Sequence, residues 1–369
     1  MKLLVCFGTR PEAIKMASLV HKFKESPSFE VRVCVTAQHR QMLDQVLDFF
    51  DIVPDYDLDI MKENQTLNEL CGRIFLKIDE VMQNFKPDVV LVHGDTTTST
   101  VCAWAAFHKN IKVGHVEAGL RTYNKFSPFP EELNRQLTSR ICDYHFAPTS
   151  QSKVNLLNEN IGSENILVTG NTVIDSLLWT AEKLNKGYEN AAIIELKSLL
   201  NFDKKVILVT GHRRENFGEG FLSICKALAH LANNNDIEIV YPVHLNPQVQ
   251  KPVMELLSGI SNIHLIAPLD YPSFVWMMQK SYFIITDSGG VQEEAPSLGK
   301  PVLVTRETTE RPEAVIEGTV VLVGTSSNKI IAAAQNLLDN TDDYEKMARA
   351  HNPYGDGKAA SRIVEFLEN

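Results

Sequence analysis

The feature that most constrains this fold is an alternation, repeated almost to the end of the chain, between short Val/Ile/Leu-rich runs and segments with helical periodicity. Such alternation is typical of parallel β-strands joined by crossover helices. The sequence therefore predicts an α/β protein. The expected strands are residues 2–7, 31–36, 88–93, 111–116, 144–147 and 165–168 in the first half, and 206–210, 237–241, 263–266, 283–286, 302–304 and 320–323 in the second.

Two domains are expected, because 369 residues exceed one ordinary compact core. The pattern restarts near Gly170 and Asn171, which divides the chain into residues 1–170 and 171–352. The clearest helix is 66–85, where apolar residues recur every three or four positions and predict one buried stripe. The last segment, 353–369, holds a final helix that can fold back onto the first domain.

Composition excludes several classes of protein. The chain has 36 Lys and Arg against 46 Asp and Glu, a net charge of −10, which argues against broad nucleic-acid binding. No apolar run approaches the roughly 18 to 20 residues that span a bilayer, so we expect no membrane segment and a cytoplasmic protein. The six cysteines form no CxxC pair and lie in apolar stretches, which predicts reduced, buried thiols, with neither disulfides nor a zinc site.

The segment FGTRPEAIK follows the first expected strand. Thr9 and Glu12 have the spacing of a helix capping box, and Pro11 suits a first helical turn. Arg10 and Lys15 would then stand near a helix N-terminus, an arrangement that favours an anion. The alternative is an ordinary glycine turn with two solvated cations. The chain has neither GxGxxG nor a P-loop motif, so dinucleotide and P-loop binding lack their signatures.

Carboxylates follow three elements of the first half: Asp95 in HGDTTT, Glu117 in GHVEAGLRT, and Glu131 or its neighbour Glu132 in PFPEELNR. Carboxylates at the strand ends of one sheet can converge on one cleft, where repulsion and partial burial separate their pKa values. This predicts acid and base chemistry. The alternative is structural: Asp95 caps a helix, Glu117 pairs with Arg121, and the remaining two lie at a helix N-terminus.

The pairs His93 with Asp95 and His115 with Glu117 have i, i+2 spacing, which invites a metal interpretation. No Cys or third clustered His completes a ligand set, so we expect no metal. The alternative is that both His side chains fill polar positions near strand ends.

In the second half, a βα turn carries GHRREN, so that His212 and Arg213 can lie beside a diphosphate. A later strand leads into TDSGGVQEEAPSLGKPV, where Ser288 and two glycines let backbone N–H groups approach phosphate oxygens. The alternative is that this SGG is only a tight turn. The two glycines are Gly289 and Gly290, and Glu294, about one helical turn further on, can reach ribose hydroxyls. Arg306 and Arg311, after the next strand, are expected to add positive charge at the same edge of the sheet.

The motifs FGTRPEAIK, TAQHR, HGDTTT, GHVEAGLRT, FPEELNR, APT, VTGNTVID, GHRREN, YPVHLNP, TDSGGVQEEAPSLGKPVLV, TTERPEA and NPYGDG occur in this order over essentially the whole chain. Together they closely resemble the non-hydrolysing UDP-N-acetylglucosamine 2-epimerase family. The resemblance implies a glycosyltransferase-B fold, with two Rossmann-like domains facing each other across a cleft. It also implies that the final helix, 353–369, crosses back to the first domain.

The resemblance further implies reversible interconversion of UDP-GlcNAc and UDP-ManNAc with no cofactor. UDP leaves by anti elimination, giving 2-acetamidoglucal, and adds back with the opposite configuration at C2. The product would supply ManNAc-derived sugars for surface polysaccharide, and the protein would be a homodimer with this small-molecule substrate as its partner.

By the same resemblance, Asp95, Glu117 and Glu131 are acid/base groups of the sugar pocket, and His212 stands beside the leaving diphosphate. Which carboxylate takes the C2 proton stays open. The implied contacts to the UDP moiety are Arg10, Lys15, Arg213, Leu269, Phe274, Ser288, Gly289, Gly290, Glu294 and Arg311, with Phe274 as the uracil platform.

One segment departs from the family pattern. Bacterial members often bind a second UDP-GlcNAc as activator, partly through residues that match Gln38, His39 and Gln41. An Arg is expected in the following loop, where this chain has Asn64. Activation by substrate is therefore an open question from the sequence.

Three rival functions share some of these features. A glycosyltransferase of the same fold would keep the SGG and Glu pattern but needs an acceptor site. A paralogous 2-epimerase of a modified UDP-N-acetyl sugar would share nearly all the motifs. A non-catalytic nucleotide-sugar binder has no need of three carboxylates at strand ends.

Overall fold

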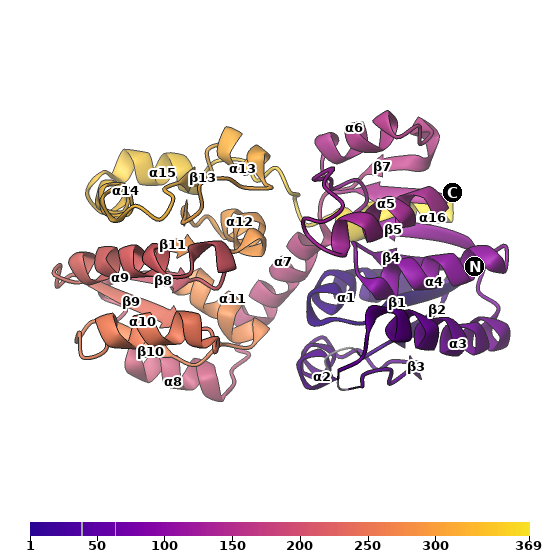
Figure 1. Ribbon diagram of the computed structural model, residues 1–369, viewed down its shortest axis with the longest axis horizontal. Coiled ribbons are helices and arrows are strands. Elements are labelled where there is room, and N and C mark those ends of the chain that lie inside the picture. Colours follow the sequence, from indigo (N-terminus) through magenta and orange to yellow (C-terminus); the bar gives the residue numbers. More distant parts are fainter. Residues whose placement is uncertain (38–39, 63) are drawn as a thin grey trace. The chain divides into compact units, whose positions relative to one another are not determined.

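The computed structural model describes residues 1–37, 40–62 and 64–369 (Figure 1). The described chain forms two compact units. The first comprises Met1–Trp179 together with Tyr354–Asn369, and the second comprises Thr180–Pro353. Each unit is built on its own parallel sheet, so the α/β class predicted from the alternation is confirmed.

The sheet of the first unit has, among the described residues, seven strands in the order β3-β2-β1-β4-β5-β6-β7, and all neighbours are parallel. Its first six positions follow the Rossmann order, which reverses direction between β1 and β4. The strands are β1 (Lys2–Phe7), β2 (Glu30–Val35), β3 (Tyr56–Asp57), β4 (Val89–His93), β5 (Lys112–Val116), β6 (Tyr144–Ala147) and β7 (Ile166–Val168).

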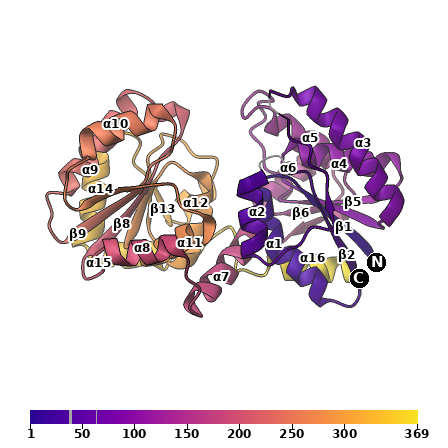
Figure 2. The ribbon, with the colours of Figure 1, turned by 90° about the horizontal axis from the view of Figure 1, so that it is seen from below.

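Helices cover both faces of this sheet, and Figure 2 shows α3 and α4 on one side and α1 and α16 on the other. The α3 and α4 side holds a buried cluster that includes Leu4, Ile74 and Val90. The helices are α1 (Arg10–Glu25), α2 (Arg40–Phe49), α3 (Leu67–Phe85), α4 (Thr97–His108), α5 (Glu131–Ile141), α6 (Ser150–Asn158), η1 (Ser163–Asn165), α7 (Thr172–Asn185) and α16 (Ala359–Glu368).

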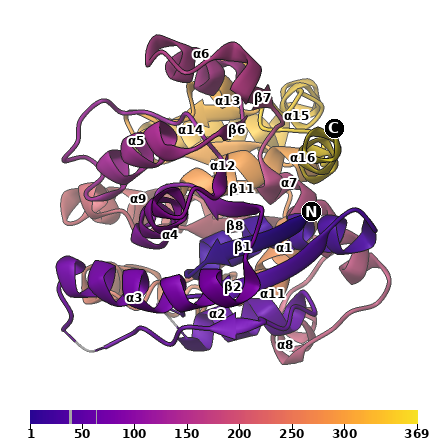
Figure 3. The ribbon, with the colours of Figure 1, turned by 90° about the vertical axis from the view of Figure 1, so that its right-hand side faces the viewer.

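Helix α3 shows how closely periodicity fixes a buried face. Thr66 caps it with a capping box to Glu69, and the predicted stripe is buried from Leu70 to Phe85. Leu67 is the exception, because 42% of it is exposed. The first turn of α3 therefore leaves an apolar side chain at the surface of the first unit. Helix α3 packs against α4, and Figure 3 shows both helices in the first unit.

The second sheet has, within the described chain, six parallel strands in the order β10-β9-β8-β11-β12-β13, which repeats the Rossmann order. They are β8 (Lys205–Thr210), β9 (Ile237–Pro242), β10 (Ile263–Ile266), β11 (Phe283–Thr286), β12 (Val302–Val304) and β13 (Val320–Leu322). The helices are α8 (Ala191–Leu199), η2 (Arg214–Asn216), α9 (Glu219–Leu231), α10 (Pro247–Leu257), α11 (Tyr271–Lys280), α12 (Gly289–Glu294), η3 (Ala295–Leu298), α13 (Pro312–Ile316), α14 (Ser327–Asp339) and α15 (Thr341–Ala348).

The division between the units falls after Trp179, inside α7, and not at Gly170 as the restart of the pattern predicts. The reason is that the start of α7 is bonded into the first unit. The N–H of Asn171 donates to the carbonyl of Tyr354 at 2.7 Å, and the Ser176 hydroxyl donates to the carbonyl of Ile14 at 2.6 Å. The carboxylate of Asp175 accepts the backbone N–H groups of Ala359 and Ala360, which start α16.

No helix in the described ranges is long and apolar enough to cross a membrane. All six cysteines are free thiols. Four are buried as predicted, but Cys71 and Cys142 are only partly buried.

Candidate active site

A cavity of about 500 Å³ lies in the first unit where β1, β4 and β5 end. This is the carboxyl edge of the sheet at the point where the strand order reverses, the usual place for a ligand in such folds. The cavity is lined by Thr9, Pro11, Glu12, Lys15, Leu67, Leu70, His93, Asp95, Thr96, Thr97, Glu117, Pro130, Glu131 and Asn134. Asp95, Glu117 and Glu131 thus share one cavity.

The turn after β1 is built as the sequence predicts. Thr9 caps α1 through a capping box with Glu12, and Pro11 lies in the first turn. The buried Glu12 carboxylate accepts the N–H groups of Gly8 and Thr9 at 3.0 and 2.8 Å and the hydroxyl of Thr96 at 2.6 Å. Burial raises the pKa of Glu12 although these donors oppose the shift. Glu12 therefore ties the β1 loop to the β4 loop, a role that sequence reasoning missed because it counted Glu12 only as a cap.

Glu117 follows β5 and is held on several sides. Its backbone φ of 64° is in the left-handed region, which costs energy for a residue with a side chain. The carboxylate forms an ion pair with Lys15 and accepts the amide N–H of Asn171 at 2.8 Å. The Nε2 atom of His93 lies 3.8 Å from the same oxygen. Burial alone would raise the pKa of Glu117, but the charge of Lys15 lowers it well below its usual range.

Asp95 lies after β4 and contacts a different cation. Its carboxylate accepts a hydrogen bond from the guanidinium of Arg135 on α5, and its carbonyl accepts the side-chain N–H of Asn134 at 2.9 Å. Burial raises the pKa of Asp95, although Arg135 opposes this. The alternative that Asp95 caps α4 is wrong, because the N-cap is Thr96.

The structure separates the two candidate glutamates at the start of α5. Glu132 is fully buried and accepts the N–H groups of Thr122 and Tyr123, each at 3.0 Å. It therefore holds the loop before α5, while Glu131 lines the cavity. The alternative pair of Glu117 with Arg121 is also wrong: Arg121 binds Glu159 at 2.6 Å instead.

His115 and His93 are both buried near strand ends. His115 contacts the carbonyl of Gly94 at 2.7 Å through Nε2, and burial lowers its pKa to about 3. Burial likewise lowers the pKa of His93 to about 4. The Nε2 atom of His93 has no hydrogen-bond partner among the described atoms. Within the described ranges no three His, Cys, Asp or Glu side chains are grouped as metal ligands.

In the second unit, the carboxylate of Asp287 organises the turn after β8. It is fully buried and accepts the backbone N–H groups of His212 and Arg213 at 2.9 and 2.8 Å and the side-chain N–H of Asn216 at 3.2 Å. The Nδ1 atom of His212 lies 3.4 Å from the same carboxylate, and burial lowers the pKa of this imidazole. Asp287 thus fixes the loop that presents His212, a role that sequence reasoning did not assign.

The SGG segment begins α12 directly after β11 and Asp287. A Cβ on Gly289 would lie 3.0 Å from the guanidinium carbon of Arg311, so the glycine permits this close approach. Arg311 also forms an ion pair with Glu293 at 2.8 Å. Ser288, Gly289 and Arg311 therefore meet at one edge of the second sheet. Gly290 is the next residue of the helix.

Arg306 does not fit the expected role of an added cation. Its side chain is only 5% exposed, and it binds Glu215 and Glu310, each at 2.6 Å. Two carboxylates therefore already balance its charge.

The remaining expected contacts are found in three places. Leu269 precedes α11 and Phe274 lies within it, and both are partly buried; Glu294 ends α12 and is 8% exposed. Arg10 is the first residue of α1. The expected activator residues Gln38 and His39 lie outside the described residues, as does the side chain of Gln41. Asn64 is described and has a φ of 56°.

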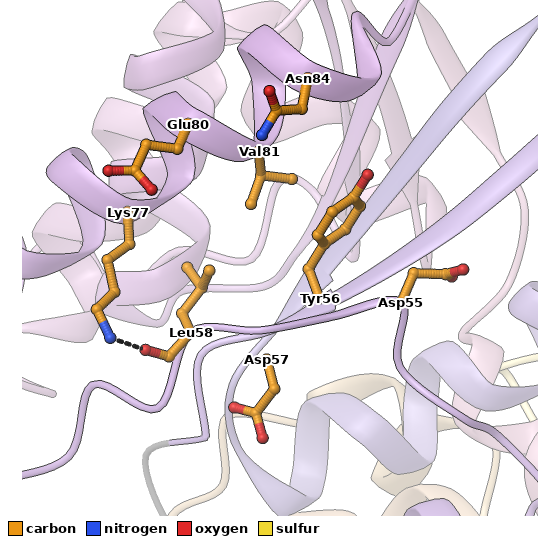
Figure 4. A pocket seen from close by; sticks show the side chains of 8 residues that line it. All are labelled: Asp55, Tyr56, Asp57, Leu58, Lys77, Glu80, Val81 and Asn84. Carbon is orange, nitrogen blue, oxygen red and sulfur yellow. Dashed lines mark hydrogen bonds between the residues drawn. The ribbon is translucent and has the colours of Figure 1, made fainter.

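A second hollow of about 400 Å³ lies beside β3 and α3 (Figure 4). Lys77 lines this hollow, and its ammonium group donates a hydrogen bond to the carbonyl of Leu58. The other lining residues include the acidic Asp55, Asp57 and Glu80. None of the expected site residues lines this hollow, so the cavity with three carboxylates is the candidate active site.

Two Rossmann-like sheets in one chain, with a carboxylate cavity on the first and a phosphate-type loop on the second, define the glycosyltransferase-B class of fold. Similarity to known proteins gives the family. The model of the family described as UDP-N-acetylglucosamine 2-epimerase matches residues 21–368. The chain belongs to this family of isomerases.

Named relatives and solved structures agree. The chain is 58% identical to the UDP-N-acetylglucosamine 2-epimerase of Salmonella typhimurium, over 100% of this chain and 99% of the relative. It is 59% identical to that of Campylobacter jejuni, over 99% and 97%. A crystal structure of the Neisseria meningitidis enzyme bound to UDP-GlcNAc is 53% identical, covers 100% of this chain and 99% of that one, and has a TM-score of 0.91.

Proposed function

We propose that this chain interconverts UDP-GlcNAc and UDP-ManNAc by a non-hydrolysing mechanism that needs no cofactor. The observation that carries the proposal is the meeting of Asp95, Glu117 and Glu131 in one cavity of about 500 Å³ at the carboxyl edge of the first sheet. The relative from Neisseria meningitidis, solved with UDP-GlcNAc, supports this choice of substrate.

The reaction proceeds by elimination and re-addition of UDP. The C2 hydrogen of the sugar is not acidic until the bond from C1 to the phosphate oxygen loosens towards an oxocarbenium ion. UDP leaves, 2-acetamidoglucal remains in the cavity, and UDP returns as a proton adds to the opposite face of C2. The protein must therefore hold both the sugar and the departing diphosphate.

The carboxylates supply the proton transfers. The pKa of Asp95 is raised by burial, while the pKa of Glu117 is lowered because Lys15 outweighs burial. Neighbouring groups with pKa values displaced in opposite directions suit general acid and general base roles. We assign Asp95, Glu117 and Glu131 to these roles together.

The diphosphate is stabilised by cations, by His212 and by the glycine turn that begins α12. We assign His212 to a place beside the leaving group, and the contacts of Asp287 with the loop that carries His212 support this role. The proposed contacts to UDP are Arg10, Lys15, Arg213, Leu269, Phe274, Ser288, Gly289, Gly290, Glu294 and Arg311.

Incubation with UDP-GlcNAc in heavy water, followed by proton NMR, tests the function. We expect the UDP-ManNAc anomeric signal to appear and the C2 proton of both sugars to be replaced by deuterium. Epimerisation without deuterium would contradict elimination. Hydrolysis to free ManNAc, or transfer of the sugar to an added acceptor, would contradict the proposal as a whole.

We also propose a homodimer. Helices α3 and α4 carry exposed apolar side chains on the outside of the first unit: Leu76 is 74% exposed, Phe107 60% and Trp104 44%. Phe75 packs edge-on against Trp104, so these aromatic groups form one surface. Large exposed apolar surfaces mark protein interfaces. Light scattering after size exclusion should give twice the chain mass, and Leu76→Lys with Phe107→Lys should give the monomer.

We further propose where the enzyme acts and what its product is used for. The enzyme acts in the cytoplasm, and its product supplies ManNAc-derived sugars for surface polysaccharide. Cell fractionation tests the first, and polysaccharide analysis of a deletion strain tests the second.

A further inference from the structure

Lys15 has two negatively charged groups to satisfy. In the structure its ammonium forms an ion pair with the carboxylate of Glu117, and both side chains are largely buried, with 17% and 8% exposed. In the proposed function Lys15 instead contacts the diphosphate. One ammonium group on one flexible stem cannot neutralise both groups equally.

We infer that Glu117 competes with the nucleoside diphosphate for the ammonium of Lys15, so that binding the diphosphate removes the counter-charge from Glu117 and prepares this carboxylate to take up a proton. This inference rests on the proposed function and deepens it. It makes Lys15 a positioning residue that links the two halves of the reaction, departure of UDP and proton transfer.

The other two described contacts of Glu117, Asn171 and His93, are not permanent cations. Asn171, at 2.8 Å, is a neutral hydrogen-bond donor. His93, with Nε2 at 3.8 Å, is an imidazole whose pKa is lowered to about 4, chiefly by burial and in part by the charge of Lys15, so it is neutral at pH 7 while Lys15 pairs with Glu117. Asp95 in the same cavity is itself acidic. Removing a cation from a buried carboxylate raises the proton affinity of that carboxylate.

The order of events follows from this exchange. Before substrate binds, Lys15 holds Glu117 in the ionised form. When the diphosphate engages Lys15, Glu117 becomes a stronger base in a site that already contains the sugar. The Nε2 atom of His93, which has no partner among the described atoms, then lies next to the oxygen that Lys15 has left.

Asp95 provides a matched comparison within the cavity. It is also a largely buried carboxylate paired with a cation, but its partner is Arg135 on α5 and not Lys15. The charge of Lys15 also lowers the pKa of Asp95, and that of Glu117 raises it, so removing the charge of Asp95 changes the potential of the same cavity while the ion pair of Lys15 with Glu117 stays in place. An effect specific to the exchange must therefore be clearly larger at position 117 than at position 95.

Isothermal titration calorimetry with UDP tests the competition through a double-mutant cycle. The proteins are the wild type, Glu117→Gln, Asp95→Asn, Lys15→Met, and the two double variants that contain Lys15→Met. We expect Glu117→Gln to bind UDP about fivefold or more tightly than the wild type, because the competing carboxylate is gone, and this gain should disappear in the Lys15→Met background. The interaction between positions 15 and 95 should stay below about twofold.

Two results would overturn the inference: unchanged or weaker UDP binding by Glu117→Gln, or an equal gain when Lys15 is already Met. Thermal unfolding identifies any variant that fails to fold. In that case Glu117→Asp, which keeps the charge but withdraws it by one methylene, must also tighten UDP binding, or the inference is wrong. Wild-type protein that binds UDP but does not epimerise would instead remove the proposed function and leave this affinity test valid.

Discussion

Glu117 and Asp287 each directly follow a strand, β5 in the first unit and β11 in the second, but they are held in different ways. Each is a buried carboxylate at the carboxyl edge of its sheet. Asp287 accepts two backbone N–H groups and an amide, so its partners are parts of one fixed loop. Glu117 faces a cavity and is held by two side chains, those of Lys15 and Asn171. A carboxylate bonded to backbone N–H groups shapes a loop, whereas one paired with a side-chain cation can change its partner.

The largest expected effect concerns the carboxylates that face the cavity. Asp95→Asn, Glu117→Gln and Glu131→Gln should each slow epimerisation by roughly 10² to 10⁴, about 3 to 5 kcal/mol of barrier, because each removes a proton-transfer group. None of the three variants should bind UDP more weakly than the wild type, and Glu117→Gln should bind it more tightly. NMR rates with UDP-GlcNAc measure the loss, and rates close to wild type in all three variants would remove the carboxylate mechanism.

For Asp287 we expect a loss of stability, in contrast to the loss of activity expected for the cavity carboxylates. Asp287→Ala should lower the free energy of unfolding by about 2 to 4 kcal/mol, because it leaves the buried N–H groups of His212 and Arg213 without an acceptor. Chemical denaturation measures this change. Glu117→Gln serves as the control, with a much smaller loss of stability. Equal losses in the two variants would erase the distinction between a carboxylate that shapes a loop and one that faces a cavity.

Arg311 lies beside Gly289 at the edge of the second sheet where we propose that the diphosphate binds. Arg311→Ala should weaken UDP binding by about 1.5 to 3 kcal/mol, since a charge-assisted contact to phosphate is lost, and turnover should fall with it. Lys300→Ala is a control on the same unit. Unchanged calorimetric affinity in Arg311→Ala would show that the diphosphate binds elsewhere.

The smallest expected effect concerns Asp175, whose contribution to the free energy of unfolding should depend on pH. Burial raises its pKa to about 6, although it accepts the N–H groups of Ala359 and Ala360. Because the folded protein holds this proton more tightly than the unfolded chain, its contribution to stability is greatest below about pH 4 and is lost as pH rises through about 6. Between pH 7 and pH 5 the stability should rise by on the order of 1 kcal/mol from this group.

Asp175→Asn tests this assignment. The variant keeps an acceptor oxygen but has no proton to gain or lose, so its thermal stability should depend less on pH between 5 and 7 than that of the wild type. Parallel curves for the two proteins would assign the pH dependence to other groups.

Much of the fold follows from the sequence because parallel strands and amphipathic helices leave strong periodic patterns. The expected strands are found within one or two residues of their predicted bounds. The strand β3 was missed because only Tyr56 and Asp57 form it, at an edge of the sheet, and two residues carry no period. The sequence also could not show that α7 begins within the first unit, since its bonds to Tyr354 and Ile14 join residues distant in the chain.

The carboxylates of the candidate active site could be predicted from the sequence, but the cations that pair with them could not. Carboxylates after parallel strands must share one edge of the sheet, so Asp95 and Glu117 could be grouped from sequence. Their cations could not be assigned, because the pairs with Arg135 and Lys15 depend on side-chain reach across separate elements. The choice between Glu131 and Glu132 likewise depends on which residue of a helix start faces inward.

The return of α16 to the first unit makes the second unit an insertion in the chain path, entered after Trp179 and left before Tyr354. The bond between Asn171 and Tyr354 brings the outgoing and returning segments together on the first unit. Recombination could therefore replace the second unit by another domain while interrupting the first unit at only one place, where these two segments meet.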